Sequence, residues 1–330
     1  MYRFKSILFA LTDAEDDLRG VAELADLAQA TGAKVRVMGM DFAAAEGLRH
    51  ALSLLGRRSD MADRVREAMV ARTERVCAAL TAKGVPATAC FREGKPFIAA
   101  IQEAMAIGAD LIAVPAAGDA SPTPFMQHLM RKAPCPVWLM RPRSGALQRG
   151  FNRILCAVDP QLDDPEKMRL ATSTLRLARS LTDHHNAALT VLHSWHVGEI
   201  GTLRSSGFVS ASEAEIDAIE VAAETAAQAG LDALVTEHSL TDVGAEIILS
   251  AGNPAETIPA TAETIAADLV VLGTVGRAGI PGLLIGNTAE AVLGKVTCSV
   301  MAVKPEGFVS PVSPGGTAQC VVAATSGAHA

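Results

Sequence analysis

Two kinds of hydrophobic pattern alternate along the chain. Short runs of consecutive apolar residues, such as 154–158 and 269–272, are separated by longer stretches in which apolar residues recur every three or four positions. A short continuous run is typical of a strand buried on both faces, and the longer spacing is typical of an amphipathic helix. Because strands that alternate with helices form parallel sheets with right-handed crossovers, the pattern predicts an α/β fold.

The pattern occurs twice. Residues 7–11 resemble residues 154–158, and the segment 135–137 resembles 298–300. Between them, three positions recur 158 residues later with the same residue types: Gly94, Pro96 and Asp110 match Gly252, Pro254 and Asp268. A repeat of this length is a duplicated domain rather than a solenoid. We therefore predict two tandem doubly wound, Rossmann-like domains, each with a five-stranded parallel sheet, at residues 1–143 and 150–305, followed by a disordered tail at 306–330 that is rich in Gly, Ser, Pro and Thr.

The second copy carries clear boundary signals. Asp164 before Pro165 predicts the start of one helix, and Ser212 with Glu215 forms a capping-box pattern at the start of another. Asn253 before Pro254 predicts a third. The apolar runs between these starts place the five strands at 154–158, 188–192, 246–250, 269–272 and 299–303.

Composition narrows the class of protein. Hydrophobic residues make up 49% of the chain and aromatic residues 4%, so the core is built mainly from Ala, Val, Leu and Ile. The net charge is -7, and no basic stripe interleaved with aromatic residues is present, which argues against nucleic-acid binding. The six cysteines form no CxxC pair, and most lie in apolar runs, where Cys behaves as a small core residue, which favours a reducing compartment. Without a signal-like segment or a membrane-length apolar run, we expect a cytoplasmic protein that does not insert into membranes.

A glycine-containing loop follows the fourth strand of the second copy. Gly273 begins it, and Gly286 precedes the next expected helix. Ligands of doubly wound sheets bind outside the carboxyl ends of the strands, glycine lets a backbone approach a phosphate closely, and free N–H groups at a helix start bind anions. The alternative interpretation is structural: Asn287 with Glu290 forms a capping box, and glycines are common in loops. Asp159, at the end of the first strand, either contacts a ribose hydroxyl or a metal, or is a turn residue before a proline.

The pattern of these residues resembles that of the universal stress protein family. Its nucleotide-binding members carry the spacing Gly, two residues, Gly, nine residues, Gly, which Gly273, Gly276 and Gly286 reproduce. The Asp at the end of the first strand and the Leu-His pair at 192–193 match the family as well. The resemblance covers both copies, and the order of the two domains resembles the tandem two-domain class of the family. It implies an adenine nucleotide alpha hydrolase-like fold.

The resemblance also implies roles for individual residues. Asp159 is expected to face the ribose or a metal, and the backbone of Ser194 to read the adenine edge. The expected phosphate ligands are Gly273, Gly276, Arg277, Gly286, Asn287 and Thr288. The expected ligand is ATP, with Mg²⁺ as an optional companion. Asn287 stands where the family carries Ser or Thr, although its amide can still donate.

The first copy departs further from the family pattern. Pro115 takes the position of Gly273 and lacks an N–H donor, Thr12 takes that of Asp159, and the following loop is five residues shorter. We expect no ordinary ATP site in this copy. Its expected role is to pair with the second copy, as family domains do in dimers, and a further homodimer stays open.

Other chemistry finds less support. The His193/His196 and His184/His185 sets lack a third ligand at a known spacing, so we expect strand-end or surface histidines, and no metal site. No nucleophile elbow, dinucleotide fingerprint or Walker loop is present, and no catalytic residue is assigned. The leading hypothesis is a stress-response regulatory protein that binds an adenine nucleotide in its second domain. The alternatives are a nucleotide-independent, chaperone-like module with an apolar pocket between the domains, and a slow nucleotide hydrolase.

Overall fold

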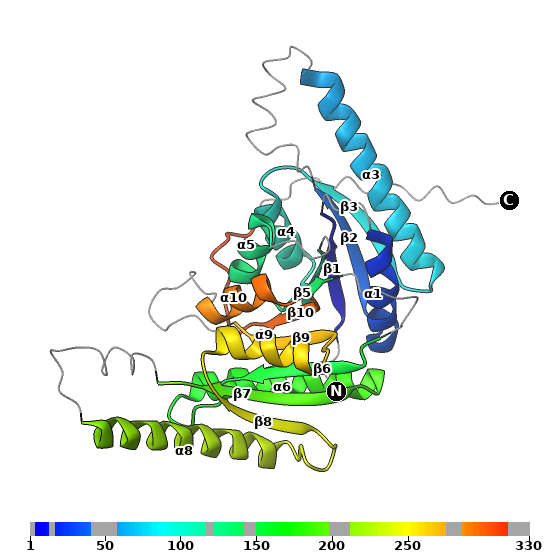
Figure 1. The fold of residues 1–330 in the computed structure, drawn as a ribbon. Helices are drawn as coiled ribbons and strands as arrows, with labels where there is room; N and C mark the ends of the chain where they lie inside the picture. Colours follow the sequence, from blue (N-terminus) through cyan, green and yellow to red (C-terminus); the bar gives the residue numbers. More distant parts are fainter. Residues whose placement is uncertain are drawn as a thin grey trace.

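The computed structural model describes residues 4–12, 17–40, 58–116, 122–141, 150–197, 212–274 and 286–315 (Figure 1). The first repeat consists of β1 (Ser6–Ala10), α1 (Asp17–Thr31), β2 (Lys34–Met40), α3 (Arg58–Ala82), β3 (Ala87–Arg92), α4 (Pro96–Ala106), β4 (Leu111–Pro115), α5 (Pro124–Lys132) and β5 (Val137–Met140). The second consists of β6 (Arg153–Val158), α6 (Pro165–His185), β7 (Ala188–Trp195), α8 (Glu213–Glu237), β8 (Glu246–Ala251), α9 (Pro254–Thr264), β9 (Leu269–Gly273), α10 (Asn287–Lys295) and β10 (Ser299–Val303).

The strands of both repeats form one sheet of ten strands in the order β3-β2-β1-β4-β5-β10-β9-β6-β7-β8. Within each repeat the five strands are parallel, which confirms the predicted doubly wound α/β architecture. The two five-stranded halves join through β5 and β10, which pair antiparallel. The expected pairing of the two copies is therefore a continuous sheet within a single chain.

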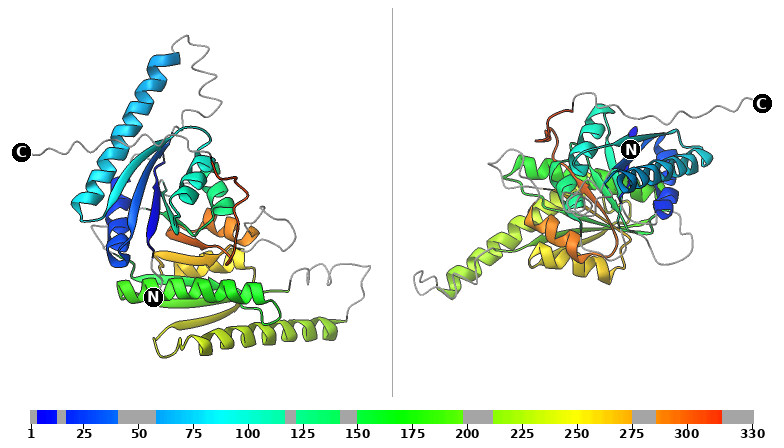
Figure 2. Two further views of the ribbon diagram at one scale, coloured as in Figure 1. Left: turned by 180° about the vertical axis from the view of Figure 1, so that it is seen from behind. Right: turned by 90° about the horizontal axis from the view of Figure 1, so that it is seen from above.

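The helices divide between the two faces of this sheet. Apolar residues of α1, α3, α6 and α8 form a buried cluster on one face, and those of α4, α5, α9 and α10 form a second cluster on the other. Both clusters contain residues from both repeats, so each face of the sheet carries one core that crosses the β5–β10 junction. Figure 2 shows the sheet with these helices from two further sides.

The predicted helix starts in the second repeat are confirmed. The Asp164 carboxylate accepts hydrogen bonds from two amides of the first turn of α6, at 3.0 and 3.1 Å. Ser212 and Glu215 form the reciprocal capping box of α8, and Asn253 accepts the amide of Ala255 in α9. The predicted strands are also present, but β7 continues three residues beyond the expected end at Leu192. This extension matters for the site described below.

The repeated aspartates have a structural role. Asp110 accepts the backbone amides of Lys5 and Ser6 at 2.7 and 3.1 Å, before and at the start of β1. Asp268 accepts the amides of Asn152 and Arg153 at 2.7 and 3.2 Å, before and at the start of β6. Because the same two bonds form in both repeats, the recurrence of this aspartate reflects the fold and not ligand binding.

The chain beyond β10 contacts the first repeat. Gln102 of α4 donates to the carbonyl of Ser313 at 3.2 Å, and Ser310 donates to the carbonyl of Lys132 at the end of α5, at 2.6 Å. Residues 306–315, which we expected to be part of a disordered tail, are thus held by side-chain hydrogen bonds and by packing of Val312. Residues 316–330 lie outside the described part of the chain. Among the described helices, none has the length and apolar character needed to cross a membrane.

Candidate functional site

A cavity of about 770 Å³ opens at the carboxyl ends of β6, β7 and β9, next to the start of α10. All residues that line it belong to the second repeat, between positions 157 and 289. The chain leaves β6 toward β7 on one side, whereas β9 and β10 lie on the other side, so β6 and β9 flank the point where the strand order reverses. Ligands of doubly wound sheets bind in the crevice at this point.

The structure brings most of the predicted site residues to this one cavity. Its lining includes Asp159, Ser194, Gly273, Gly286 and Thr288, which are far apart in the sequence. The predicted phosphate ligands Gly276 and Arg277 lie outside the described residues. Asn287 forms the first position of α10, but its side chain is outside the described part as well.

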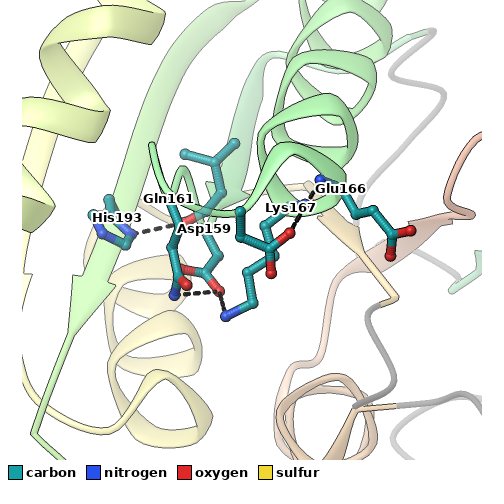
Figure 3. A network of polar contacts seen from close by, with 7 residues as sticks. Asp159, Gln161, Glu166, Lys167 and His193 are labelled. Atoms are coloured by element: carbon teal, nitrogen blue, oxygen red, sulfur yellow. Dashed lines mark hydrogen bonds and ion pairs between the residues drawn. The ribbon is translucent and has the colours of Figure 1, made fainter. Parts of the chain in front are cut away.

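Asp159 takes part in a polar network at the rim of the cavity (Figure 3). One carboxylate oxygen lies 3.2 Å from Nζ of Lys167, and Gln161 donates to the other oxygen at 3.1 Å. Lys167 lies in the first turn of α6, where the Asp164 cap fixes its backbone. Sequence analysis missed Lys167 and Gln161. The only available signal for Lys167 was its place three residues after the helix cap.

β7 extends beyond the end of β6 beside the cavity. Val158, the last residue of β6, pairs with His193, whereas Ser194 and Trp195 continue the pairing with β8. The carbonyl of Trp195 accepts a hydrogen bond from Gly252 on the β8 side, at 2.9 Å. Because successive strand residues direct their backbone groups to opposite edges, the N–H and C=O of Ser194 face the β6 side. The pairing of Val158 with His193 assigns the Ser194 N–H to the carbonyl of Val158, whereas the Ser194 C=O lies beyond the end of β6.

Proline keeps this edge open. If β6 continued in the register that pairs Val158 with His193, the amide of residue 160 would reach the carbonyl of Ser194. Residue 160 is proline, which has no N–H. The cavity therefore borders a backbone carbonyl, that of Ser194, which the neighbouring strand does not use, while the Ser194 hydroxyl is engaged with the carbonyl of Gly252 at 2.9 Å.

His193 is held in the wall of the cavity. Its Nδ1 lies 3.0 Å from the carbonyl of Val158, and the side chain is buried. Burial lowers the pKa of His193, although the bond to Val158 opposes the effect. We assign the neutral tautomer that donates from Nδ1 to this carbonyl, which leaves the Nε2 lone pair as an acceptor. Sequence analysis placed His193 at a strand end but gave it no role in the site.

Two glycines shape the opposite wall. A Cβ on Gly273 would lie 2.8 Å from the side chain of Leu170 in α6, so this position is small because α6 packs against the end of β9. Gly286 is the N-cap of α10 and has no side chain to cap it, and among the described residues no side chain caps the first amides of the helix. The alternative of a capping box formed by Asn287 and Glu290 is therefore wrong: the helix already includes Asn287, and Glu290 pairs with Arg131 of α5.

The corresponding corner of the first repeat is arranged differently. Thr12, which replaces Asp159, is buried and donates from its hydroxyl to the carbonyl of Pro115 at 3.2 Å. This bond joins the end of β1 to the end of β4 across the point that the cavity occupies in the second repeat. The absence of an ATP site in this repeat stays a prediction.

Comparisons with known proteins agree with this architecture. The model of the universal stress protein family matches residues 3–141 and 150–304. Universal stress protein E of Escherichia coli strain K12 is 29% identical over 229 residues, which cover 66% of this chain and 68% of that protein. A universal stress protein E homolog of Haemophilus influenzae is 52% identical over 54 residues, 16% of this chain and 18% of that protein.

Solved structures show the same fold across both repeats. A structure described as a putative universal stress protein from Pseudomonas aeruginosa has a TM-score of 0.65 at 23% identity, and the match covers 92% of this chain and 95% of that one. A universal stress protein from Archaeoglobus fulgidus has a TM-score of 0.59 at 17% identity, with 90% and 98% covered. Since the family model matches both repeats and nearly the whole described chain, the chain belongs to the universal stress protein family.

Proposed function

We propose that the second repeat binds an adenine nucleotide, ATP in the first instance, and that the protein acts as a cytoplasmic stress-response regulator through this binding. The observation that carries the proposal is the meeting of Asp159, Ser194, Gly286 and Thr288 around one cavity of about 770 Å³. Small-molecule sites have volumes of about 300–1,000 Å³ and combine apolar walls with a few placed polar groups. The proposal assigns the polar groups of this cavity to the three parts of a nucleotide.

The base would occupy the open edge of β7. The C=O of Ser194, which β6 leaves unused, is an acceptor that the exocyclic amino group of an adenine edge complements. Apolar walls from Ile258 and Leu192 flank this edge and would cover the base. Asp159, at the end of β6, would accept a ribose hydroxyl, for which its half-exposed carboxylate is suited.

The phosphates would bind at the start of α10. No side chain in the described part of the chain caps its first amides, and free N–H groups at a helix start attract anions. The Thr288 hydroxyl lies in the same turn, and Lys167 supplies a positive charge across the cavity. Gly276 and Arg277, also assigned to the phosphates, belong to the segment between β9 and α10. If Mg²⁺ accompanies the nucleotide, the carboxylates of Asp159 and Asp163 are the lining residues that suit it.

Calorimetric titration of the full chain with ATP and Mg²⁺ tests the proposal. We expect one saturable site, weakened in Asp159→Ala and in Thr288→Val, and unchanged in Asp242→Ala. Asp242 is an exposed acid at the opposite, amino-terminal end of β8, so it controls for the loss of one negative charge. An absence of saturable binding in the wild-type protein would contradict the proposal.

Two further readouts separate the alternatives. Release of inorganic phosphate from ATP by the wild type, and not by Asp159→Ala, would extend the function to slow hydrolysis. Saturable binding of an apolar fluorescent probe without nucleotide binding would favour the nucleotide-independent module instead. The cavity at the carboxyl ends of β6, β7 and β9 lies within the second repeat and not between the repeats. We therefore expect an apolar probe to bind at the same residues as those proposed for the nucleotide.

A further inference from the structure

A second candidate site lies between the two repeats, where the C-terminal end of α6 meets α1. His184 and His185 are the last two residues of α6, and Asp26 lies in α1 of the first repeat. Each of the three side chains offers one ligand atom, and the three atoms lie within 4.8 Å of one another. The end of α6 lies beside α1 in both Figure 1 and Figure 2.

Two of the distances within this group match those between metal ligands. The Asp26 carboxylate oxygen lies 3.5 Å from Nε2 of His184 and 3.4 Å from Nδ1 of His185. Zinc binds imidazole nitrogen and carboxylate oxygen at about 2.0–2.1 Å, so two ligand atoms at a tetrahedral angle are separated by about 3.3–3.4 Å. A cation placed between the three atoms would need little rearrangement of the side chains.

The ligands are also held in place. The ring of His185 is almost fully buried and packs edge-on against Phe151, with centroids 5.0 Å apart. Phe151 in turn packs against Trp138, at 5.8 Å. Gly150 leaves room beside Nδ1 of His185, because a Cβ at this position would lie 2.4 Å from that atom. Metal sites of high affinity need this kind of support behind their ligands.

The electrostatic surroundings favour a cation. The C-terminal end of α6 carries the negative end of the helix dipole, and Asp26 adds a carboxylate. Nε2 of His184 is buried and makes no hydrogen bond to any described residue, so it is available as a ligand. Two imidazoles and one carboxylate form a donor set that divalent zinc accepts, with water completing the tetrahedron.

We propose that Asp26, His184 and His185 form a binding site for a divalent transition-metal cation of the zinc class, which links α1 of the first repeat to α6 of the second. The site is independent of the proposed nucleotide site, since the two share no residue. Two ligands come from one repeat and the third from the other, so metal binding would stabilise the arrangement of the two repeats. Sequence analysis expected no metal because the third ligand lies 158 residues from the histidine pair.

Titration of the tag-free, chelator-treated full chain with ZnCl₂ and CoCl₂ tests the site. We expect uptake of one Zn²⁺ per chain, a rise in the thermal midpoint, and the visible absorption of four-coordinate Co²⁺. Asp26→Asn, His184→Gln and His185→Gln should each weaken Zn²⁺ binding by about tenfold or more, since loss of even an outer-shell partner costs about 10–100-fold.

The controls separate this site from general histidine binding. His238→Gln removes a partly buried imidazole beside Glu237, at 3.8 Å, and should leave Zn²⁺ uptake and the Co²⁺ spectrum unchanged. Thermal midpoints measured in chelator should be similar for all variants, which would show that they fold. The proposal is overturned if the wild type takes up no stoichiometric Zn²⁺, or if uptake persists in Asp26→Asn and His184→Gln.

Discussion

Arg141 and Lys304 occupy equivalent positions in the two repeats, and each reaches a helix of the other repeat. Arg141 follows β5 and donates from Nη2 to the carbonyl of Leu293 in α10, at 2.8 Å. Lys304 follows β10 and donates from Nζ to the carbonyl of Met130 in α5. The same exchange in both directions is what an isologous dimer interface shows, here built within one chain.

The strand register at the junction has the same symmetry. Val137 pairs with Ala302, Leu139 with Val300, and Trp138 with Met301 between them. Since Val137 corresponds to Val300 and Leu139 to Ala302 in the repeat, a pseudo-twofold axis passes through the Trp138–Met301 pair. The edge strand of each repeat, β5 or β10, is thus paired with the edge strand of the other, which leaves β3 and β8 as the outer strands of the sheet.

The two equivalent residues differ in how they hold a proton, and this difference leads to a prediction about pH. Arg141 stays protonated, whereas burial lowers the pKa of Lys304 to about 7, with a small opposing effect from Cys135. The unfolded chain keeps the ordinary value of 10.5. Between these values the unfolded state binds a proton that the folded state does not, so the free energy of unfolding should rise with pH, by at most about 1.4 kcal/mol per unit.

Urea denaturation between about pH 7 and 8.5 measures this slope. The range stops there because the buried thiols Cys135 and Cys156, whose pKa values are raised by burial, contribute with the opposite sign above pH 9. Lys304→Met should flatten the profile, and Lys83→Met, at an exposed position, should not. An equal slope in the Lys304→Met protein would show that another group carries the dependence.

A second prediction concerns a glycine in the middle of α8. Gly230 packs against the Pro160 segment of the cavity rim: a Cβ there would lie 2.2 Å from the carbonyl oxygen of Pro160. For Gly294 in α10, no atom of a described residue lies within 4 Å of the same hypothetical Cβ. Alanine is the better helix former by about 0.5–1 kcal/mol, so Gly294→Ala should stabilise the protein by that amount.

Gly230→Ala should have the opposite effect. The added methyl group forces Pro160 away from α8, and overpacking of this kind costs about 1–3 kcal/mol. Because Asp159 precedes Pro160, nucleotide affinity should fall together with stability. Chemical denaturation of both variants, with calorimetric titration of ATP, checks the pair. If Gly230→Ala were as stabilising as Gly294→Ala, the contact between α8 and the rim would not be tight.

The sequence predicted the fold well because its signals are local. The Asp164 and Ser212 caps and the apolar runs depend on neighbouring residues, and the structure confirms them. Gly273, Gly286 and Thr288 also line one cavity, because carboxyl ends of parallel strands share an edge, and their binding of phosphate stays a prediction. The contacts that were missed depend on how separate elements pack: Lys167 of α6 beside Asp159 at the end of β6, Arg141 and Lys304 on helices of the opposite repeat, and Asp26 beside the histidine pair. None of these pairings leaves a spacing signal in the chain.

A third prediction concerns the charged cluster of the first repeat. Glu103 of α4 is buried and accepts a hydrogen bond from Nε of Arg92 at 2.8 Å, and Nη1 of Arg36 lies 3.4 Å from its other oxygen. Removing one member of a buried ion pair leaves its partner uncompensated, at a cost of about 3–5 kcal/mol. Glu103→Gln should therefore lower the free energy of unfolding by an amount near that range.

The matched control is an exposed pair in the same repeat. Glu93 lies 2.8 Å from Arg66, and both side chains are about half exposed or more, at 62% and 48%. Exposed pairs contribute about 0–1 kcal/mol, so Glu93→Gln should change the unfolding free energy by less than about 1 kcal/mol. Equal effects of the two substitutions in urea denaturation would mean that burial does not strengthen the Glu103 cluster.

The last prediction tests the role of Lys167 within the proposed nucleotide site. Its ammonium group lies 3.2 Å from the Asp159 carboxylate at the rim. Lys167 lines the same cavity as Gly286 and Thr288 at the start of α10. If it contacts a phosphate, Lys167→Met should raise the Kd for ATP about tenfold, which corresponds to the loss of about 1.4 kcal/mol from one charged hydrogen bond. The Kd for adenosine, which has no phosphate, should change little. Lys34→Met, at an exposed position of the first repeat, serves as the control for charge. Equal losses for ATP and adenosine would instead show that Lys167 acts through Asp159, by positioning the carboxylate that meets the ribose.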